Sequence, residues 1–216
     1  SIDDMQPALP LIFPKISSDN SFGKLMSQAE DMDGNTILAM GEPAKSNLAV
    51  YGYNKGENIN SYAKPIDTKI DDLYMYMRSI FDFTVIDCTK DVMGNKYTAK
   101  ALINADVTVN LVSCDIYGLV FFDSQKPILE HSQYHYDRFI NCLTLNGAFE
   151  QDTMEMSDLS SAKYVIPYSK KVAETINMGL AFEKVPDRNY RSVLTKIIDE
   201  IVGEKSAEDL SEHNDD

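Results

Sequence analysis

The stretch KYTAKALINADVTVNLVSCD, residues 96–115, changes its hydrophobic pattern partway along. Residues 95–104 have the spacing of an amphipathic helix, whereas residues 107–112 are an apolar run of the kind found in a fully buried strand. Ser113, Cys114 and Asp115 then follow at the end of that run. A helix next to a strand that is apolar throughout is typical of a parallel sheet with helices on both faces.

The same alternation extends along most of the chain. Strands are predicted at residues 10–13, 36–40, 83–87, 107–112, 139–143 and 164–166. Helices are predicted at residues 21–32, 67–80, 95–104, 116–131, 170–177 and 188–202. Gly34 is expected to end the first helix, Asp67 to cap the second, and Pro127 to interrupt the fourth. The pattern predicts an α/β fold of three layers, α-β-α, around a mainly parallel sheet.

Composition narrows the possible functions. The 216 residues include 34 acids and 20 bases, for a net charge of −14, and 44% are hydrophobic. That apolar fraction excludes disorder of the whole chain, and the charge argues against nucleic acid as a partner. We expect an N-terminal segment or linker at 1–10, one domain at 10–202, and an acidic, disordered tail at 203–216. A docking peptide for a basic partner is the alternative for the tail.

The sequence predicts a cytoplasmic protein. It contains neither an apolar segment of membrane-spanning length nor a signal segment at its start. Cys88, Cys114 and Cys142 lie in apolar runs, as reduced core thiols do. His131 and His135 have the spacing of a zinc-binding pair, but a surface connection is the preferred interpretation.

Parallel sheets place their functional sites at the carboxyl ends of the strands. Asp87 ends the predicted strand at 83–87, where nucleotide-binding folds hold magnesium, and a carboxylate that caps a turn is the alternative. Ser169 follows the predicted strand at 164–166 and is expected to cap the helix at 170–177.

Three segments in this order carry a family resemblance: DFTVIDCT (82–89), the stretch at 96–115, and YVIPYSKKVAETINMGLAFEK (164–184). The set resembles the MinD/ParA group of deviant Walker A ATPases, which belong to the SIMIBI class of P-loop NTPases. It is most similar to the CpaE/TadZ pilus-assembly subgroup. The resemblance implies a P-loop NTPase-like fold over most of residues 10–202. It also implies a homodimer across the nucleotide face and a receiver-like domain ahead of residue 1.

On the phosphate side, the resemblance implies a degenerate P-loop. Counting back from Gly34, Lys15 matches the signature lysine of the family and Ser21 matches its magnesium-binding hydroxyl. The glycines of the family loop are missing, Asn20 stands where the main phosphate-binding lysine would be, and Asp19 adds a negative charge. Backbone N–H groups and the lysine normally hold the phosphates, so this loop is a poor cradle for them.

At the switch and adenine-side positions of the family, this sequence matches some residues and departs from others. Glu42 matches the second acid of the family switch, whereas Met40 replaces the first. Asn146 matches the asparagine that contacts adenine, and Pro167 matches the proline beside the base. If nucleotide binds, Glu42 and Asp87 are the candidate catalytic residues, and Ser21 and Asp87 are the candidate magnesium ligands.

Three functional hypotheses stay open at this point. The first is an inactive, ATPase-like scaffold without a cofactor. It would bind protein partners of a membrane-associated assembly, such as a Tad/Flp-type pilus or secretion machine, and be recruited to the membrane or cell pole. The second is a divergent active ATPase that binds ATP and magnesium, and the third is a DNA-positioning protein. A homodimer is expected to rest on side-chain burial, with Met75 and Tyr76 as candidate exposed residues.

Overall fold

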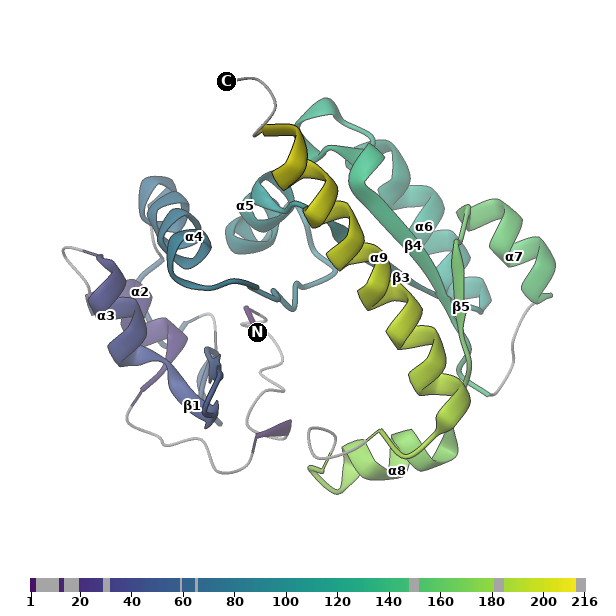
Figure 1. Ribbon diagram of the computed structural model, residues 1–216, viewed down its shortest axis with the longest axis horizontal. Coiled ribbons are helices and arrows are strands. Elements are labelled where there is room, and N and C mark those ends of the chain that lie inside the picture. The colour runs from purple at the N-terminus through teal and green to yellow at the C-terminus, as the bar shows by residue number, and fades with distance from the viewer. Residues whose placement is uncertain are drawn as a thin grey trace. The chain divides into compact units, whose positions relative to one another are not determined.

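The computed structural model describes residues 1–2, 12–13, 20–28, 32–58, 60–64, 66–147, 152–180 and 185–212. The chain divides into two compact units, Ser1–Asn104 and Ala105–Asp216, and each is described in its own right (Figure 1). The predicted strand at 10–13 falls mostly outside the described residues, as do Lys15 and Asp19.

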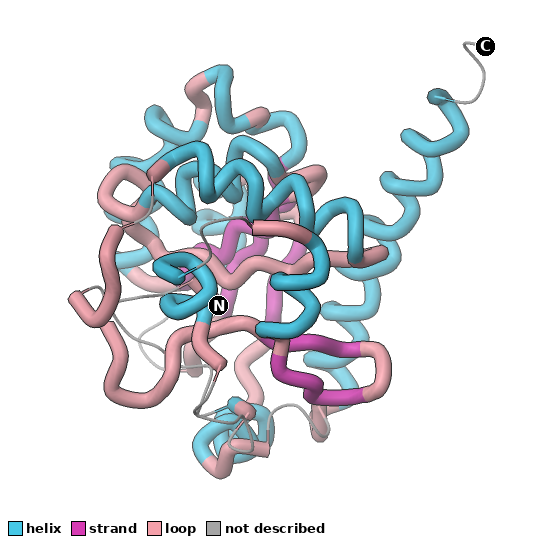
Figure 2. Tube along the Cα trace, turned by 90° about the vertical axis from the view of Figure 1, so that its left-hand side faces the viewer, coloured by secondary structure: helices cyan, strands magenta, loops and turns pink. Residues whose placement is uncertain are grey.

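The first unit is mainly helical. Its elements are α2 (Phe22–Gln28), α3 (Gly34–Met40), β1 (Glu42–Lys45), β2 (Leu48–Val50), α4 (Asp67–Ile80) and α5 (Lys96–Asn104). Strands β1 and β2 form an antiparallel hairpin (Figure 2). The helices bury a common core that includes Phe22, Ile37, Ile70 and Leu73, and Ile2 also belongs to it. The predicted helices at 67–80 and 95–104 are confirmed.

Gly34 does not end a helix, and that prediction is wrong. It is the first residue of α3, and the Asp33 side chain caps this helix by accepting a hydrogen bond from the Thr36 N–H at 2.7 Å. The predicted strand at 36–40 is therefore also wrong, because these residues are helical. An Asp at the N-cap fixes a helix start more firmly than a short apolar run fixes a strand.

The segment 83–87 is a second departure from the sequence-based expectation. It is neither helix nor strand, and Val85 is 93% exposed. Ile86 packs against the core of the first unit, while the Asp87 carbonyl accepts a hydrogen bond from the Ile2 N–H at 3.1 Å. A strand that is apolar throughout is stable only where other elements cover both of its faces. Here Val85 is left uncovered, so the apolar run is not part of a buried strand. A smaller error concerns Asp67, which is the first residue of α4 while Ile66 is its cap.

The second unit contains a parallel sheet in the order β3-β4-β5. Its elements are β3 (Thr108–Ser113), α6 (Ile116–Leu129), the 3-10 turns η1 (Ser132–Tyr134) and η2 (Tyr136–Arg138), β4 (Phe139–Thr144), α7 (Thr153–Ser160), β5 (Tyr164–Ile166), α8 (Lys170–Asn177) and α9 (Arg188–Glu212). All three strands of this sheet, and α8, lie where the sequence predicts them.

Helices cover both faces of this sheet. On one face, Val112 and Leu143 pack with Phe122 of α6 and Met156 of α7. On the other face, strands β4 and β5 pack against Ile197 of α9, which crosses in front of the strands in Figure 1. The second unit therefore has the predicted α-β-α layering around a parallel sheet.

Two helices run further than the sequence predicts. Pro127 does not interrupt α6, which continues to Leu129. Pro127 has no N–H to donate to the carbonyl four residues earlier, so the helix lacks one backbone hydrogen bond there but continues for two more residues. Helix α9 continues to Glu212, so the helix includes much of the acidic segment at 203–216.

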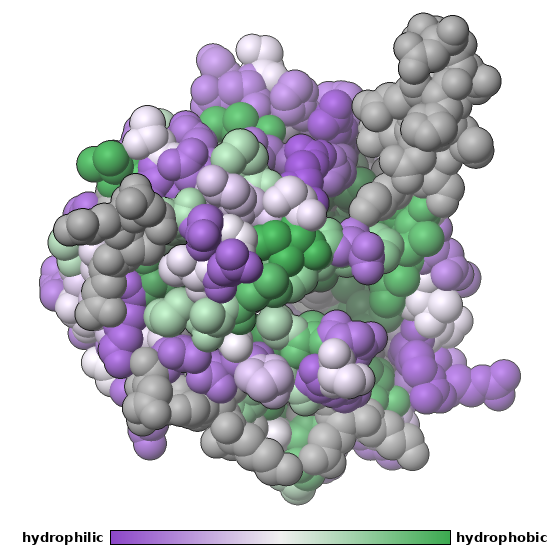
Figure 3. Space-filling model, turned by 60° about the vertical axis from the view of Figure 1, so that its left-hand side comes forward, coloured by the Kyte–Doolittle hydropathy of each residue, from purple (hydrophilic) through white to green (hydrophobic). Residues whose placement is uncertain are grey.

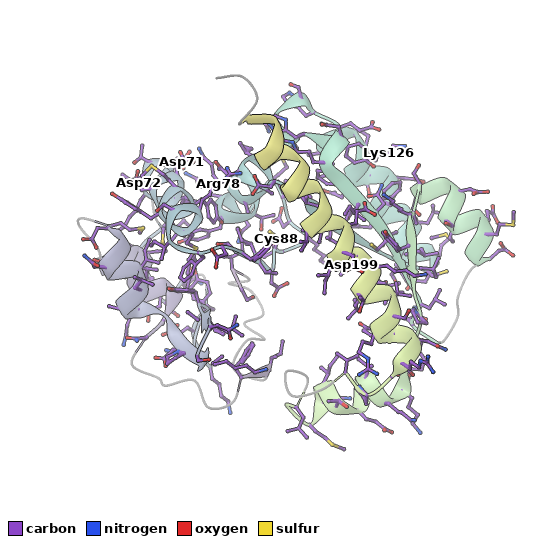
Figure 4. The ribbon with its side chains drawn as sticks, in the orientation of Figure 1. Asp71, Asp72, Arg78, Cys88, Lys126 and Asp199 are labelled. Carbon is purple, nitrogen blue, oxygen red and sulfur yellow. The ribbon has the colours of Figure 1, made fainter. Side chains whose placement is uncertain are left out.

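The cysteines and histidines lie largely as expected. Cys114 and Cys142 are buried thiols, and Cys88, labelled in Figure 4, is a half-buried thiol in the segment of the chain that joins α4 to α5. Burial raises the pKa of the Cys88 and Cys142 thiols to about 11, so both are protonated at neutral pH. The predicted surface connection is confirmed, because His131 and His135 are exposed beside the 3-10 turns.

Over the residues that the structure describes, no helix combines the length and apolar character needed to cross a membrane. Hydrophobic and hydrophilic residues are interspersed on the face that Figure 3 shows.

Candidate functional site

Ser21, the predicted magnesium ligand, lies at the start of α2 with its side chain fully engaged. Its hydroxyl accepts hydrogen bonds from the Gly23 and Lys24 N–H groups at 3.1 and 3.4 Å and donates to Glu57 Oε2 at 2.7 Å. The residue is only 4% exposed. The first two bonds are those of a helix N-cap. The hydroxyl is therefore part of the fold of this unit.

Glu57 gathers donors from three parts of the chain. Besides Ser21, the Asn54 N–H donates to it at 2.8 Å and the Tyr62 hydroxyl at 2.6 Å. Partial burial favours its neutral acid, but the bonds from Ser21, Tyr62 and Asn54 outweigh that effect and lower the pKa of Glu57. A fixed negative charge thus lies against the Ser21 hydroxyl.

Close packing at Gly23 explains how Tyr62 reaches Glu57. A Cβ atom on Gly23 would lie 2.1 Å from the ring of Tyr62, so only glycine leaves room for the ring at this turn of α2. A cavity of about 100 Å³ opens beside these two residues, with Tyr53, Tyr97 and Lys96 in its wall. It is well below the roughly 300 Å³ at which pockets for drug-sized ligands begin.

Glu42 lies near Ser21, as the predicted site requires. It begins β1, and together with Asn20, Ser21 and Met40 it lines a cavity of about 10 Å³. A space of that size holds about one water molecule. These residues line the same space, which is far too small for a phosphate chain.

Of the other candidate residues of the first unit, Asp87 does not line the cavity beside Ser21 and Glu42. The Asp87 side chain is exposed, and its backbone bonds to Ile2. Lys15 lies outside the described residues, and the positions counted back from Gly34 remain predictions. Among the residues described here, the Ser21 hydroxyl is engaged in hydrogen bonds within the unit, and the carboxylate that accepts from it adds a negative charge where phosphates would lie.

In the second unit, polar residues meet at the carboxyl edge of the parallel sheet. Asp115 follows β3, Asn146 follows β4, and Pro167 follows β5. The strand ends are held in register by the Cys114 N–H, which donates to the Thr144 carbonyl at 2.9 Å, and by the Leu145 N–H, which donates to the Ile166 carbonyl at 3.0 Å. The two predicted base-contacting residues, Asn146 and Pro167, therefore lie at the same edge.

Asp115 is the centre of this edge. Its carboxylate accepts hydrogen bonds from the Ser113 hydroxyl at 2.6 Å, the Gly118 N–H at 2.8 Å and the Asn146 amide at 3.0 Å. The Ser113 and Gly118 bonds, in that order, are the main causes that lower its pKa. One carboxylate thus caps α6 and ties together the ends of β3 and β4.

The exposed ring of Tyr168 forms the rest of the edge. Gly147 has a φ of +73°, and a Cβ atom there would lie 2.5 Å from the Tyr168 ring. Asn146 is exposed and Pro167 is half-buried beside this ring. A flat ring and an amide at adjacent strand ends can contact a flat heterocycle by stacking and hydrogen bonding.

Next to this edge, Ser169 caps α8 as predicted. Its hydroxyl accepts a hydrogen bond from the Val172 N–H at 3.3 Å and donates to Asp187 Oδ2 at 3.0 Å. Asp187 in turn accepts from the Tyr190 N–H at 3.0 Å. One hydrogen-bonded pair thus fixes the starts of α8 and α9.

Two central residues of these clusters were missed by the sequence interpretation as site residues. Asp115 had a usable signal, because an Asp between a predicted strand and a predicted helix is a common N-cap. Glu57 had none, because it lies in a polar loop 36 residues from Ser21.

Comparisons with known proteins identify the fold. A scan of protein families and a search of curated proteins find no match. Among solved structures, a ParA family ATPase from Chlorobium tepidum TLS is similar with a TM-score of 0.70 and 10% identity, over 84% of this chain and 75% of that one. The septum site-determining protein MinD from Pyrococcus horikoshii OT3, complexed with Mg-ADP, is similar with a TM-score of 0.69 and 15% identity, over 92% of this chain and 80% of that one. The chain thus has an α/β, P-loop NTPase-like fold of the MinD/ParA kind.

Proposed function

We propose that this chain is a scaffold with an ATPase-like fold that has lost ATP hydrolysis and acts by binding other proteins. The single observation that carries the proposal is the Ser21–Glu57 pair. The hydroxyl predicted to bind magnesium caps α2 and donates to a carboxylate at 2.7 Å. A polyphosphate at this position would meet the charge of Glu57 and would have to displace an internal hydrogen bond.

The finer assignment follows the resemblance to the CpaE/TadZ subgroup. In this proposal the chain positions or regulates a membrane-associated assembly, such as a Tad/Flp-type pilus or secretion machine. Its protein partners recruit it to the membrane or cell pole. Cys88, Cys114 and Cys142 are thiols outside any disulfide, which supports a place in the cytoplasm.

Calorimetric titration of Mg–ATP into the intact chain tests the proposal. We expect no heat of binding in the micromolar range and no phosphate release above the blank. The Glu57→Gln variant removes the facing charge and keeps the shape, so it separates two reasons for weak binding. If the variant binds Mg–ATP, the charge of Glu57 is what prevents binding. If the variant gives no heat of binding either, the missing glycines and lysine of the loop are the cause. Micromolar binding by the unaltered chain would refute the nucleotide-free scaffold.

The second candidate function is a divergent active ATPase, and the carboxyl edge of the second unit favours it. Asn146, Pro167 and the Tyr168 ring lie together there, as a base-binding site would need. In that case Lys15→Ala and Asp87→Ala should each abolish turnover. Turnover that survives both changes would reject this assignment of the site.

A further inference from the structure

The cavity beside Gly23 in the first unit combines an aromatic floor with a charged rim. Its volume is about 100 Å³. Tyr53 and Tyr97 belong to its wall and are each only 6% exposed, so they form the inner part of that wall. Lys64 and Lys96 belong to the same wall and are exposed, so they lie at the rim. A recess with an apolar interior and a few polar groups is typical of a ligand site.

The floor of the cavity is held in place by its neighbours. Phe22 makes edge contacts with both tyrosine rings, with centroid distances of 5.7 Å to Tyr53 and 5.1 Å to Tyr97. Asn95, also in the wall, accepts a hydrogen bond from the Thr98 N–H at 2.8 Å. A ligand would therefore enter a recess whose shape is already set, and little binding energy would be lost in ordering it.

The charges around the cavity favour an anion. Three acids lie near the wall, and each already accepts a hydrogen bond: Glu57, Asp67 and Asp91. Lys96 is paired with Asp67 at 2.6 Å. Lys64, in contrast, has no ion pair with any residue that the structure describes. An anion in the cavity would thus gain the Lys64 ammonium group without breaking an ion pair of the fold.

We propose that this cavity binds a carboxylate carried on a short apolar stem. A cavity of about 150 Å³ holds benzene, so one of about 100 Å³ holds about four to six non-hydrogen atoms, the size of propionate. The stem would lie on the tyrosine rings, and the carboxylate would accept a charge-assisted hydrogen bond from Lys64 at the rim. Inorganic phosphate fits less well, because it has no apolar part for the rings to cover.

Two sources supply this chemistry. One is a free short-chain carboxylic acid. The other is a glutamate side chain of a protein partner, which has the same stem and carboxylate as propionate. A side chain that fills a small, preformed pocket is the usual anchor of a protein interface. Only the second source rests on the proposed function, in which the chain binds other proteins.

Two-dimensional ¹H–¹⁵N NMR of the intact chain, at constant ionic strength, tests the site. Sodium propionate should shift the amide signals of Gly23 and Gly94, both in the wall, in a saturable way. A Kd of about 1 mM is expected, which lies within the affinity that so few atoms can supply. The signal of Gly118, in the second unit, should not move. Propionamide has the same shape without the charge and should bind at least about tenfold more weakly.

Substitution at the rim tests the role of Lys64. Lys64→Gln should weaken propionate binding about fivefold or more, because the charge-assisted bond is lost. Lys55→Gln is the matched control, since Lys55 is an exposed lysine of the same loop that is not part of the wall, and it should leave binding unchanged. Both lysines are exposed, so neither change disturbs the core.

A blocked tripeptide with a central glutamate distinguishes the two sources. Saturable shifts with both the peptide and propionate would support the side chain of a protein partner, and shifts with propionate alone would support a free acid. No saturable shift with either up to about 50 mM, equal affinity for propionamide, or equal loss with Lys55→Gln would each overturn the proposal. Binding of Mg–ATP is measured separately, so this proposal and the scaffold function can fail independently.

Discussion

Glu57 accepts hydrogen bonds from Ser21, Asn54 and Tyr62, and its charge makes those bonds stronger than neutral ones. We expect Glu57→Gln to lower the free energy of unfolding by about 1–2 kcal/mol at pH 7, a range reduced from the full charged-bond value because the group is partly exposed. Urea unfolding of both chains measures the difference.

The difference in the free energy of unfolding between the two chains should depend on pH. The folded pKa of Glu57 is lowered, so its stabilisation is complete above the ordinary value of 4.5 and is lost as the pH falls through the lowered value. The two chains should therefore differ by a constant amount from pH 6 to 8 and converge in acid. Glu42→Gln is the control, a half-buried acid of the same unit that should change stability little. A difference that persists in strong acid would contradict the role given to the charge.

Sequence reasoning identified one residue of each hydrogen-bonded pair, Ser21 of Ser21–Glu57 and Asn146 of Asn146–Asp115. The sequence indicated Ser21 as a candidate because it resembles a loop residue of a known family. It did not indicate Glu57, because a hydrogen bond between residues 36 positions apart leaves no local pattern. Asn146 was predicted as a contact for a base, but its bond to Asp115 depends on the register of β3 and β4.

Among the elements, α6 depends on a cap that also joins two strands. Asp115 caps this helix and holds Ser113 and Asn146, whereas Asp152 caps α7 by accepting from the Met154 and Glu155 N–H groups at 3.0 Å. Loss of a cap costs about 0.5–2 kcal/mol. We expect Asp115→Ala to exceed that range and Asp152→Ala to stay within it, as measured by urea unfolding. Equal losses would mean that the link between the strands contributes nothing.

The length and pattern of each helix or strand explain which sequence-based predictions were confirmed. Helix α4 was predicted because its period is long and it has one clear buried face, and β3 and β4 were predicted because their apolar runs are flanked by helices. The errors at 36–40 and 83–87 fall on short apolar runs, where length and period do not distinguish strand, helix and coil. Asp33 decides the first as a helix, while the second leaves Val85 exposed. Patterning on α4 also indicated exposed apolar residues at Met75 and Tyr76, but Tyr76 is partly buried against the core and only Met75 is exposed.

For the whole molecule, the excess of 34 acids over 20 bases predicts a stability that depends on salt. Repulsion among these charges destabilises the compact chain, and salt screens it, because the Debye length falls from about 10 Å at 0.1 M to about 3 Å at 1 M. Ion pairs such as Lys96–Asp67 weaken at the same time, but exposed pairs contribute only about 0–1 kcal/mol each. We therefore expect the melting temperature to rise by several degrees between low and high sodium chloride.

Two comparisons separate screening from other effects of salt on the melting temperature. Chloride and thiocyanate at equal, low ionic strength should act alike if screening is the cause. A melting temperature that falls as salt rises would mean that the ion pairs contribute more to stability than the repulsion among the acids removes.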